Sequence, residues 1–372
     1  MLIKITPFDT LFFRDGKPFN MGDETWTDGI FPPYPSVFYG ALRTLYFANH
    51  IDEFKKVNTE EDPTKNLKIK NIFYRIHGCN FYPIPLDLVE IKSKKQTNTP
   101  EKEYGKEYER EYEVVNLKIS EQKIISSKDE KLNMLYYDDE VMGLDDGVIS
   151  KGDLHEYLAG KLENATAEKI SDNIKKESKI SIKKDRLKGN SEDGKLYRLD
   201  LLRLVDFDIC VEFEGIDIPD RGYLKIGGEN KAAYYMRIDK YPGISSKLKD
   251  GKFKLYINTP AIFKKGWLPE WVDSNTYEGN FKGINLKLIT AAVGRYNLIG
   301  GFSMKDKNGL PYPKPMRRAV PAGSVYYFET DEKDMDKIVN TFNGVSISEF
   351  DTSKEGFGIW YVGGWKWWKL LE

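Results

Sequence analysis

The chain has 372 residues, 40% of them hydrophobic and 31% charged, with a formal net charge of −1. This length corresponds to about two ordinary domains, and the high apolar and aromatic content excludes a disordered chain. No apolar run approaches the ~18 residues that span a bilayer, and the first residues lack the pattern of a secretory signal, so we expect a cytoplasmic protein without membrane contact. Because its only cysteines are Cys79 and Cys210, a disulfide framework and a multi-cysteine metal site are excluded, and we expect no metal and no cofactor.

The hydrophobic pattern then predicts a strand, a long helix and a series of strands. Apolar residues alternate from Leu2 to Ile5, and the segment 36–54 carries one apolar stripe with Ser36 as its expected N-cap. Further strands are expected at 67–76, 205–213, 253–257, 286–293, 324–328 and 357–362, and a short helix within 132–158. This order is typical of an α+β protein with antiparallel sheets.

The length allows two ferredoxin-like domains, for which we expect residues 1–215 and 216–372. The segment from about 92 to 195 is rich in Lys and Glu and poor in clustered hydrophobic residues, so we expect insertions or mobile loops there. The sequence lacks the common motifs of nucleotide binding and serine hydrolysis. It contains no phosphate-binding loop, dinucleotide fingerprint or serine-hydrolase motif, and its three histidines lie outside the basic region described next, so we predict no catalytic residue.

Charge is distributed unevenly along the chain. Residues 221–328 contain 19 Lys or Arg and 7 Asp or Glu, a net charge of +12, and the remainder therefore carries −13. Such an asymmetry is typical of a nucleic-acid footprint, although a merely solvated basic face would give the same count.

Paired glycines coincide with this basic region. The pairs Gly227-Gly228 and Gly300-Gly301, and the later Gly356 and Gly358, allow close backbone approach and let amide groups cradle phosphates. Hairpin corners are the alternative interpretation. The basic residues near them, which charge alone marks as candidates for phosphate contact, are Lys231, Arg237, Arg295, Lys314, Arg317 and Arg318. The late tryptophans Trp360, Trp365, Trp367 and Trp368 offer flat rings for unpaired bases, or else fill the core.

An ordered series of short motifs extends along the chain. They are PFDTLFFRDGKPF at 7–19, PSVFYGALR at 35–43, IGGE at 226–229, AVGR at 292–295, IGGF at 299–302, PKP at 313–315, AVPAGSVY at 319–326 and GFG at 356–358. Taken together they resemble the subunit that binds the crRNA 5′ handle in the type III-B (Cmr) CRISPR effector complex, a member of the RAMP superfamily. Lys17 and Ile226 stand where that family often has Arg and Leu, and Lys cannot reproduce a bidentate Arg contact.

The resemblance implies two ferredoxin-like (RRM-like) RAMP domains that hold the repeat-derived 5′ end of the guide RNA and dock on the large polymerase-like subunit, beside the backbone RAMP subunit. It implies that this subunit is not the nuclease. By the motif match, Arg14, Lys17 and Arg43 would serve the N-terminal RNA or partner surface. The glycine-rich handle site would be shaped by Gly227, Gly228, Arg295, Gly300, Gly301, Gly356 and Gly358.

Two other interpretations stay open at the level of sequence. One is a metal-independent endoribonuclease of the same superfamily that processes guide precursors with a Tyr, Lys or His as acid and base. The other is an aromatic-rich carbohydrate-binding protein, against which the net charge of +12 in residues 221–328 argues. The acidic remainder suggests a protein-docking surface.

Overall fold

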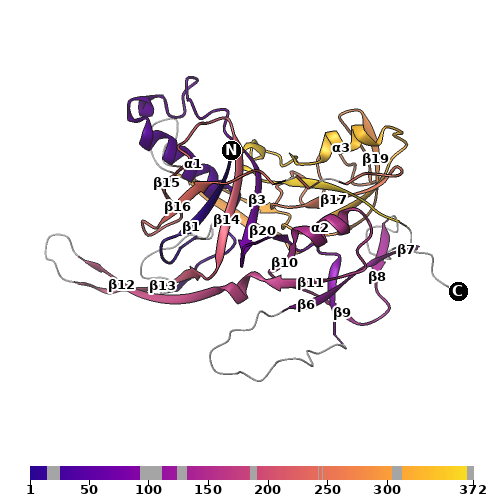
Figure 1. Ribbon diagram of the computed structural model, residues 1–372, viewed down its shortest axis with the longest axis horizontal. Coiled ribbons are helices and arrows are strands. Elements are labelled where there is room, and N and C mark those ends of the chain that lie inside the picture. Colours follow the sequence, from indigo (N-terminus) through magenta and orange to yellow (C-terminus); the bar gives the residue numbers. More distant parts are fainter. Residues whose placement is uncertain are drawn as a thin grey trace.

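A computed structural model describes residues 1–14, 26–92, 111–123, 132–184, 191–241, 243–244, 246–303 and 312–366. These residues form mostly antiparallel sheets with few helices, which confirms the predicted α+β class (Figure 1). The α-helices are α1 (Pro35–Asn49), α2 (Lys151–Leu158) and α3 (Met335–Phe342), and short 3-10 helices are η1 (Ile51–Lys56), η2 (Ile170–Asn173) and η3 (Ser353–Glu355). No helix in the described ranges is long and apolar enough to cross a membrane.

The largest sheet runs through both halves of the chain. Its strands are, in spatial order, β15 (Arg221–Lys225), β16 (Ala232–Arg237), β1 (Leu2–Pro7), β14 (Phe207–Glu214), β3 (Lys68–Ile76), β4 (Cys79–Pro83), β10 (Gly147–Ser150), β11 (Asn164–Lys169), β6 (Tyr112–Asn116), β5 (Leu88–Ile91) and β9 (Val141–Gly143). The strands β15 and β16 follow the expected domain boundary at 215, yet β16 pairs with β1.

A second sheet belongs to the C-terminal part. Its order is β18 (Glu278–Phe281), β19 (Ile284–Ala292), β22 (Val325–Glu329), β17 (Lys252–Ile257), β24 (Ile359–Gly364) and β23 (Val345–Ser346). The smaller sheets combine β12 (Ile174–Lys184), β13 (Ser191–Leu204) and β2 (Trp26–Asp28); β20 (Asn297–Ser303) and β21 (Tyr312–Ala319); and β7 (Lys118–Lys123) and β8 (Asn133–Tyr136).

The segment 92–195 is therefore more ordered than its composition predicts. Its described parts contribute several strands that continue the large sheet beyond β4, and a long β12–β13 hairpin that extends away from the sheets (Figure 1). Isolated apolar side chains such as Val114, Ile149 and Ala167, each 0% exposed, are sufficient to bury one face of these strands. The strands of this segment were not among the predicted elements, whereas α2 (Lys151–Leu158) forms the short helix expected within 132–158.

Helix α1 covers one face of the large sheet. Phe38, Leu42 and Leu45 pack on Ile3 and Ile5 of β1 in one buried cluster. Pro35 occupies the first turn, where its missing N–H costs no hydrogen bond, and Tyr34 rather than Ser36 is the N-cap residue. The α-helix ends at Asn49, and the last predicted helical residues form η1 instead.

Both sheets contain a four-strand core with the same order. In the large sheet the spatial order is β16-β1-β14-β3, and α1 lies between β1 and β3 in the sequence. In the second sheet the spatial order is β24-β17-β22-β19, and α3 lies between β22 and β24 in the sequence. A complete ferredoxin-like unit has two crossover helices, whereas the described residues of each core supply one.

The two sheets meet across a buried polar network. Asp87 is fully buried and accepts a hydrogen bond from the Tyr157 hydroxyl at 2.7 Å and another from Tyr327. The ammonium nitrogen of Lys254 lies 3.2 Å from the centroid of the Tyr157 ring. Burial lowers the pKa of Lys254 to about 8, against a smaller opposing effect of Asp87. These contacts join β17 and β22 of the second sheet to α2 and to the loop after β4.

Candidate nucleic-acid interface

The first predicted glycine pair lies in the loop that joins β15 to β16. Gly227 has φ +77°, and a Cβ atom there would lie 2.5 Å from the carbonyl oxygen of Phe12. The amide of Gly228 donates to that same oxygen at 2.8 Å. The pair therefore lets the loop contact the 12–13 backbone closely, while both glycines remain exposed.

Basic residues surround this loop. The ammonium group of Lys231 donates to Thr10 Oγ1 at 2.7 Å and lies 3.5 Å from Asp9. Arg203, on β13, donates to Asp9 at 2.7 Å and also pairs with Glu177 of β12. Hydrogen bonds from the Thr10 backbone and from Arg203 hold the pKa of Asp9 below its usual value. We call this group of side chains, with the 226–231 loop, the loop group.

Sequence reasoning missed Arg203, because it lies outside both the predicted strands and the basic region 221–328. Its alternation within a strand pattern would have been the available signal. Among the residues predicted from motifs, Arg14 is exposed at the end of the segment that contacts the loop, and Lys17 lies outside the described residues.

The second glycine pair lies on β20. The register of the β20–β21 pair shifts between Ile299 and Gly301, which marks a bulge, and a Cβ atom at Gly301 would lie 3.3 Å from the Lys314 side chain. This hairpin brings together six predicted residues, namely Arg295, Gly300, Gly301, Lys314, Arg317 and Arg318. We call it the arginine hairpin.

The guanidinium groups of this hairpin lie on aromatic rings. The Arg317 guanidinium carbon is 3.6 Å from the centroid of the Phe350 ring, and that of Arg318 is 4.7 Å from the Tyr296 ring. Stacking occupies the face of a guanidinium group but leaves its N–H edges directed outward. Lys314 lies 3.5 Å from Glu355, and Arg295 is exposed just before β20.

The segment before α1 connects the two groups. The amide of Ile30 donates to the carbonyl of Phe13 at 2.8 Å, and the hydroxyl of Tyr34 donates to the carbonyl of Leu298 at 3.4 Å. Four residue steps of extended chain span at most about 14 Å. Ile30, which contacts the backbone next to the loop group, and Tyr34, which contacts the arginine hairpin, therefore lie within that distance of each other.

Other predicted residues do not join these two groups. Gly356 and Gly358 are buried at positive φ, and a Cβ atom at Gly356 would lie 2.7 Å from Ile69 on β3. Arg43 donates to Asp62 at 2.6 Å and to Thr64 at 2.8 Å, which holds it on the protein. Arg237 is exposed on β16 and pairs with Asp220 at 3.2 Å.

Two of the aromatic side chains considered for base stacking fill the core instead. Trp360 is fully buried and Trp365 is 7% exposed. Trp367 and Trp368 lie outside the described residues. Phe12 and Phe13, in the aromatic turn, are also buried.

Groups with acid, base or metal-binding chemistry lie elsewhere. The Nδ1–H of His50 donates to the Tyr46 carbonyl oxygen, and the His50 ring stacks on the Tyr46 ring. His155 is on α2, near Glu156. Within the described ranges, no group of three or more His, Cys, Asp or Glu side chains could hold a metal ion. Burial raises the pKa of Cys210 to about 12.

Known structures with similar architecture come from CRISPR complexes. A chain of the type III-B Cmr-beta complex, bound to cognate target RNA and AMPPnP, matches with 15% identity and a TM-score of 0.49 over 88% of this chain and 86% of that chain. A second Cmr-beta structure with cognate target RNA matches with 16% identity and a TM-score of 0.49 over 91% and 89%. A chain of the type III-A Csm3-Csm4 subcomplex matches with 14% identity and a TM-score of 0.34 over 90% and 94%.

The sequence itself gives the decisive comparison. No curated protein matches it. The family described as CRISPR-associated protein (Cas_Cmr3) matches residues 3–365, which is nearly the whole chain. This extent of match confirms the resemblance stated from the motifs, and the chain belongs to the Cmr3 family of CRISPR-associated proteins.

Proposed function

We propose that this chain is a noncatalytic RNA-binding subunit of a type III-B CRISPR effector complex, and that it anchors the 5′ repeat-derived handle of the crRNA for antiviral defence. Membership of the Cmr3 family supports the complex. The observation that carries the RNA site is the arginine hairpin, which gathers Arg295, Arg317 and Arg318 on one exposed element beside the loop group.

The chemistry of this hairpin suits a phosphate chain. A guanidinium group stacked on a ring loses little further freedom when its N–H edge binds a phosphate oxygen. Arg317 and Arg318 are held in this way by Phe350 and Tyr296. The aromatic platforms therefore order the arginines before RNA arrives, which lowers the entropic cost of binding.

A salt series tests this site. We expect Arg318→Ala to weaken binding of fluorescently labelled handle RNA and to reduce the slope of log K against log salt by about 0.7, the value of one phosphate contact on a single strand. Lys287→Ala is the matched control, because it removes one exposed positive charge from β19. Equal affinity and slope for Arg318→Ala and wild type would contradict the assignment.

The noncatalytic part of the proposal has its own test. Labelled repeat RNA incubated with the protein in EDTA should remain intact. Discrete cleavage products that disappear in the His50→Ala or Tyr39→Phe variant would instead favour the metal-independent endoribonuclease.

Docking on the large polymerase-like subunit, next to the backbone RAMP subunit, is a further part of the proposal, supported by the family. Coexpression with the large subunit should give a stable complex on gel filtration. Elution of the two chains in separate peaks at micromolar concentration would contradict the docking role.

We also propose that the two four-strand cores are diverged ferredoxin-like units, each with one of its two helices.

A further inference from the structure

The outer face of the large sheet carries aromatic side chains in contact with one another. Tyr223 of β15 is paired with Tyr234 of β16, and their ring centroids are 5.9 Å apart. The ring of Phe8, just after β1, lies 5.3 Å from that of Tyr223. Tyr223 is 67% exposed and Phe8 60% exposed, so neither side chain is part of the core.

This part of the face is open because of how the sheets are covered. The opposite face, with Ile5 and Tyr235, is buried under α1. The outer-face residues Leu2, Phe73 and Cys210 share a buried cluster with tyrosines of the second sheet, whereas no residue of β15 or β16 belongs to that cluster. The surface formed by β15, β16 and the end of β1 therefore remains exposed.

Basic residues flank the rings on the same face. Alternation along β15 puts Arg221 and Lys225, both exposed, on the side of Tyr223. Across the sheet follow Lys4 of β1 and Arg75 of β3, which donates to the Tyr241 hydroxyl at 3.0 Å.

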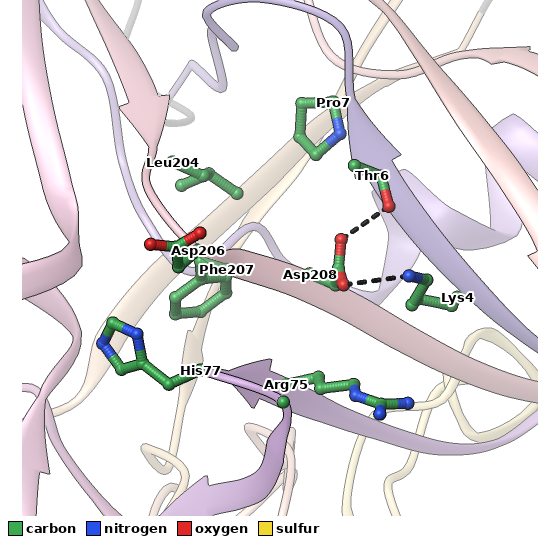
Figure 2. A pocket seen from close by; sticks show the side chains of 10 residues that line it. Lys4, Thr6, Pro7, Arg75, His77, Leu204, Asp206, Phe207 and Asp208 are labelled. Carbon is green, nitrogen blue, oxygen red and sulfur yellow. Dashed lines mark hydrogen bonds and ion pairs between the residues drawn. The ribbon is translucent and has the colours of Figure 1, made fainter.

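A shallow depression of about 380 Å³ continues this surface (Figure 2). Lys4, Thr6, Arg75 and His77 line it together with Asp206 and Asp208. As Figure 2 shows, the Asp208 carboxylate is held between Thr6, at 2.5 Å, and Lys4, at 3.3 Å. Its charge is therefore matched within the protein, and it opposes an incoming anion less than a free carboxylate would.

We propose that this outer face binds single-stranded RNA, with unpaired bases on Phe8 and Tyr223 and phosphates at Arg221 and Lys225. The inference deepens the proposed function and rests on it. The 226–231 loop joins β15 to β16, so the loop group lies at one end of this face. Exposed rings between cations are the combination that binds unpaired nucleotides with little sequence preference. Protein interfaces are also enriched in aromatic side chains and Arg, but they are depleted of Lys, so the exposed Lys225 on the side of Tyr223 favours RNA over a protein partner.

Substitution at Tyr223 separates stacking from charge. Tyr223→Leu keeps apolar area but removes the ring, and we expect binding of fluorescently labelled crRNA to weaken on the order of tenfold, because one base–ring contact is lost. The slope against salt should not change, since no cation is removed. Tyr223→Phe is the matched control and should bind as wild type does. The midpoint of thermal unfolding checks that the variants fold equally well.

The outcomes distinguish this inference from the proposed function. If wild type binds crRNA, Arg318→Ala weakens binding and Tyr223→Leu with Phe8→Leu does not, the open-face site is wrong and the handle site stands. If wild type binds no RNA, the proposed function fails as well. If the Tyr223 variants keep RNA affinity but lose the large subunit on copurification, the face is a protein interface and the inference is overturned.

A photocrosslink gives an independent measurement. crRNA carrying 4-thiouridine should crosslink on irradiation to peptides that contain Phe8 or Tyr223. Crosslinks confined to peptides of the β20–β21 hairpin would overturn the inference.

Discussion

Arg317 and Phe350 are held face to face, with 3.6 Å between the guanidinium carbon and the ring centroid. The ring is 41% exposed, so this contact lies at the surface. A cation–π contact at such a site contributes about 0.5 to 1 kcal/mol. The contact orients the arginine more than it stabilises the fold.

Phe350→Leu should therefore weaken handle RNA binding by about two- to fivefold, because Arg317 keeps its charge but loses its platform. The slope of log K against log salt should stay at the wild-type value, whereas Arg317→Ala should lower it by about 0.7. Fluorescence anisotropy over a salt series measures both quantities. A lower slope for Phe350→Leu would contradict the orienting role.

Gly227→Ala should destabilise the protein. The residue has φ +77°, and a Cβ atom there would lie 2.5 Å from the Phe12 carbonyl oxygen, so we expect a loss of about 1 to 3 kcal/mol in the free energy of unfolding. Gly40→Ala, within α1 and with open space at its Cβ position, should instead be neutral or stabilising by up to about 1 kcal/mol. Urea unfolding measures both changes, and equal midpoints for the two variants would contradict the close contact.

The main effect of Arg43→Ala should be on the free energy of unfolding rather than on RNA affinity. The substitution removes the ion pair with Asp62, a side chain that is 6% exposed, and we expect a loss of about 2 kcal/mol. Arg237→Ala, whose ion pair with Asp220 is exposed, should change the free energy of unfolding by less than about 1 kcal/mol. If Arg43→Ala unfolds like wild type but loses RNA affinity, the arginine serves RNA, as its motif alone predicts.

Stability should rise with pH through the titration of Lys254. Its pKa in the folded protein is lowered to about 8 by burial, below the ordinary value of 10.5 for a lysine. Between pH 8 and pH 10.5 the unfolded chain binds more protons than the folded one. The free energy of unfolding therefore increases with pH in this range, by up to about 1.4 kcal/mol per pH unit. Below pH 8 both states carry the charge, and this gain is absent.

Lys254→Met isolates this effect. The variant keeps the contact with Tyr157 but has no proton to bind, so wild type should gain stability relative to Lys254→Met from pH 8 to pH 10. Urea unfolding at each pH gives the difference. A constant difference across this range would show that Lys254 titrates normally.

The sequence predicts those elements whose apolar pattern is strong. The strand that begins at Leu2, the helix before Asn49 and the strand around Ile209 are formed as expected, because each buries one continuous face. The strands between Tyr112 and Lys184 could not be found in the same way. Most of them are short and bury few apolar side chains, and backbone pairing with neighbours distant in sequence holds them.

The candidate site was predicted in part. Arg317 and Arg318 lie on β21 and Arg295 lies just before β20, so the structure brings together residues that the motif match and the charge had marked separately, and their contact with RNA stays a prediction. Gly356 carried the same sequence signal as Gly227, yet it packs on Ile69 inside the protein. A glycine in a sequence indicates a close backbone approach or a left-handed turn. Only the tertiary structure shows which group approaches it.

The open aromatic face was outside the reach of sequence reasoning. Phe8 and Tyr223 become neighbours only because β16 pairs with β1 and β15 with β16. In one dimension Tyr223 is an ordinary member of a short strand, and Phe8 is part of a motif assigned to another role.

The central position of β1 has a consequence for biosynthesis. Leu2 pairs with Glu212, and Ile3 pairs with Arg237 on the other side. This strand leaves the ribosome before both of its partners, and it must wait, unpaired on both edges, until both have been translated. Loop closure over so long a separation slows folding and exposes an edge that other chains can join. Production of this protein should accordingly benefit from slower translation or lower temperature.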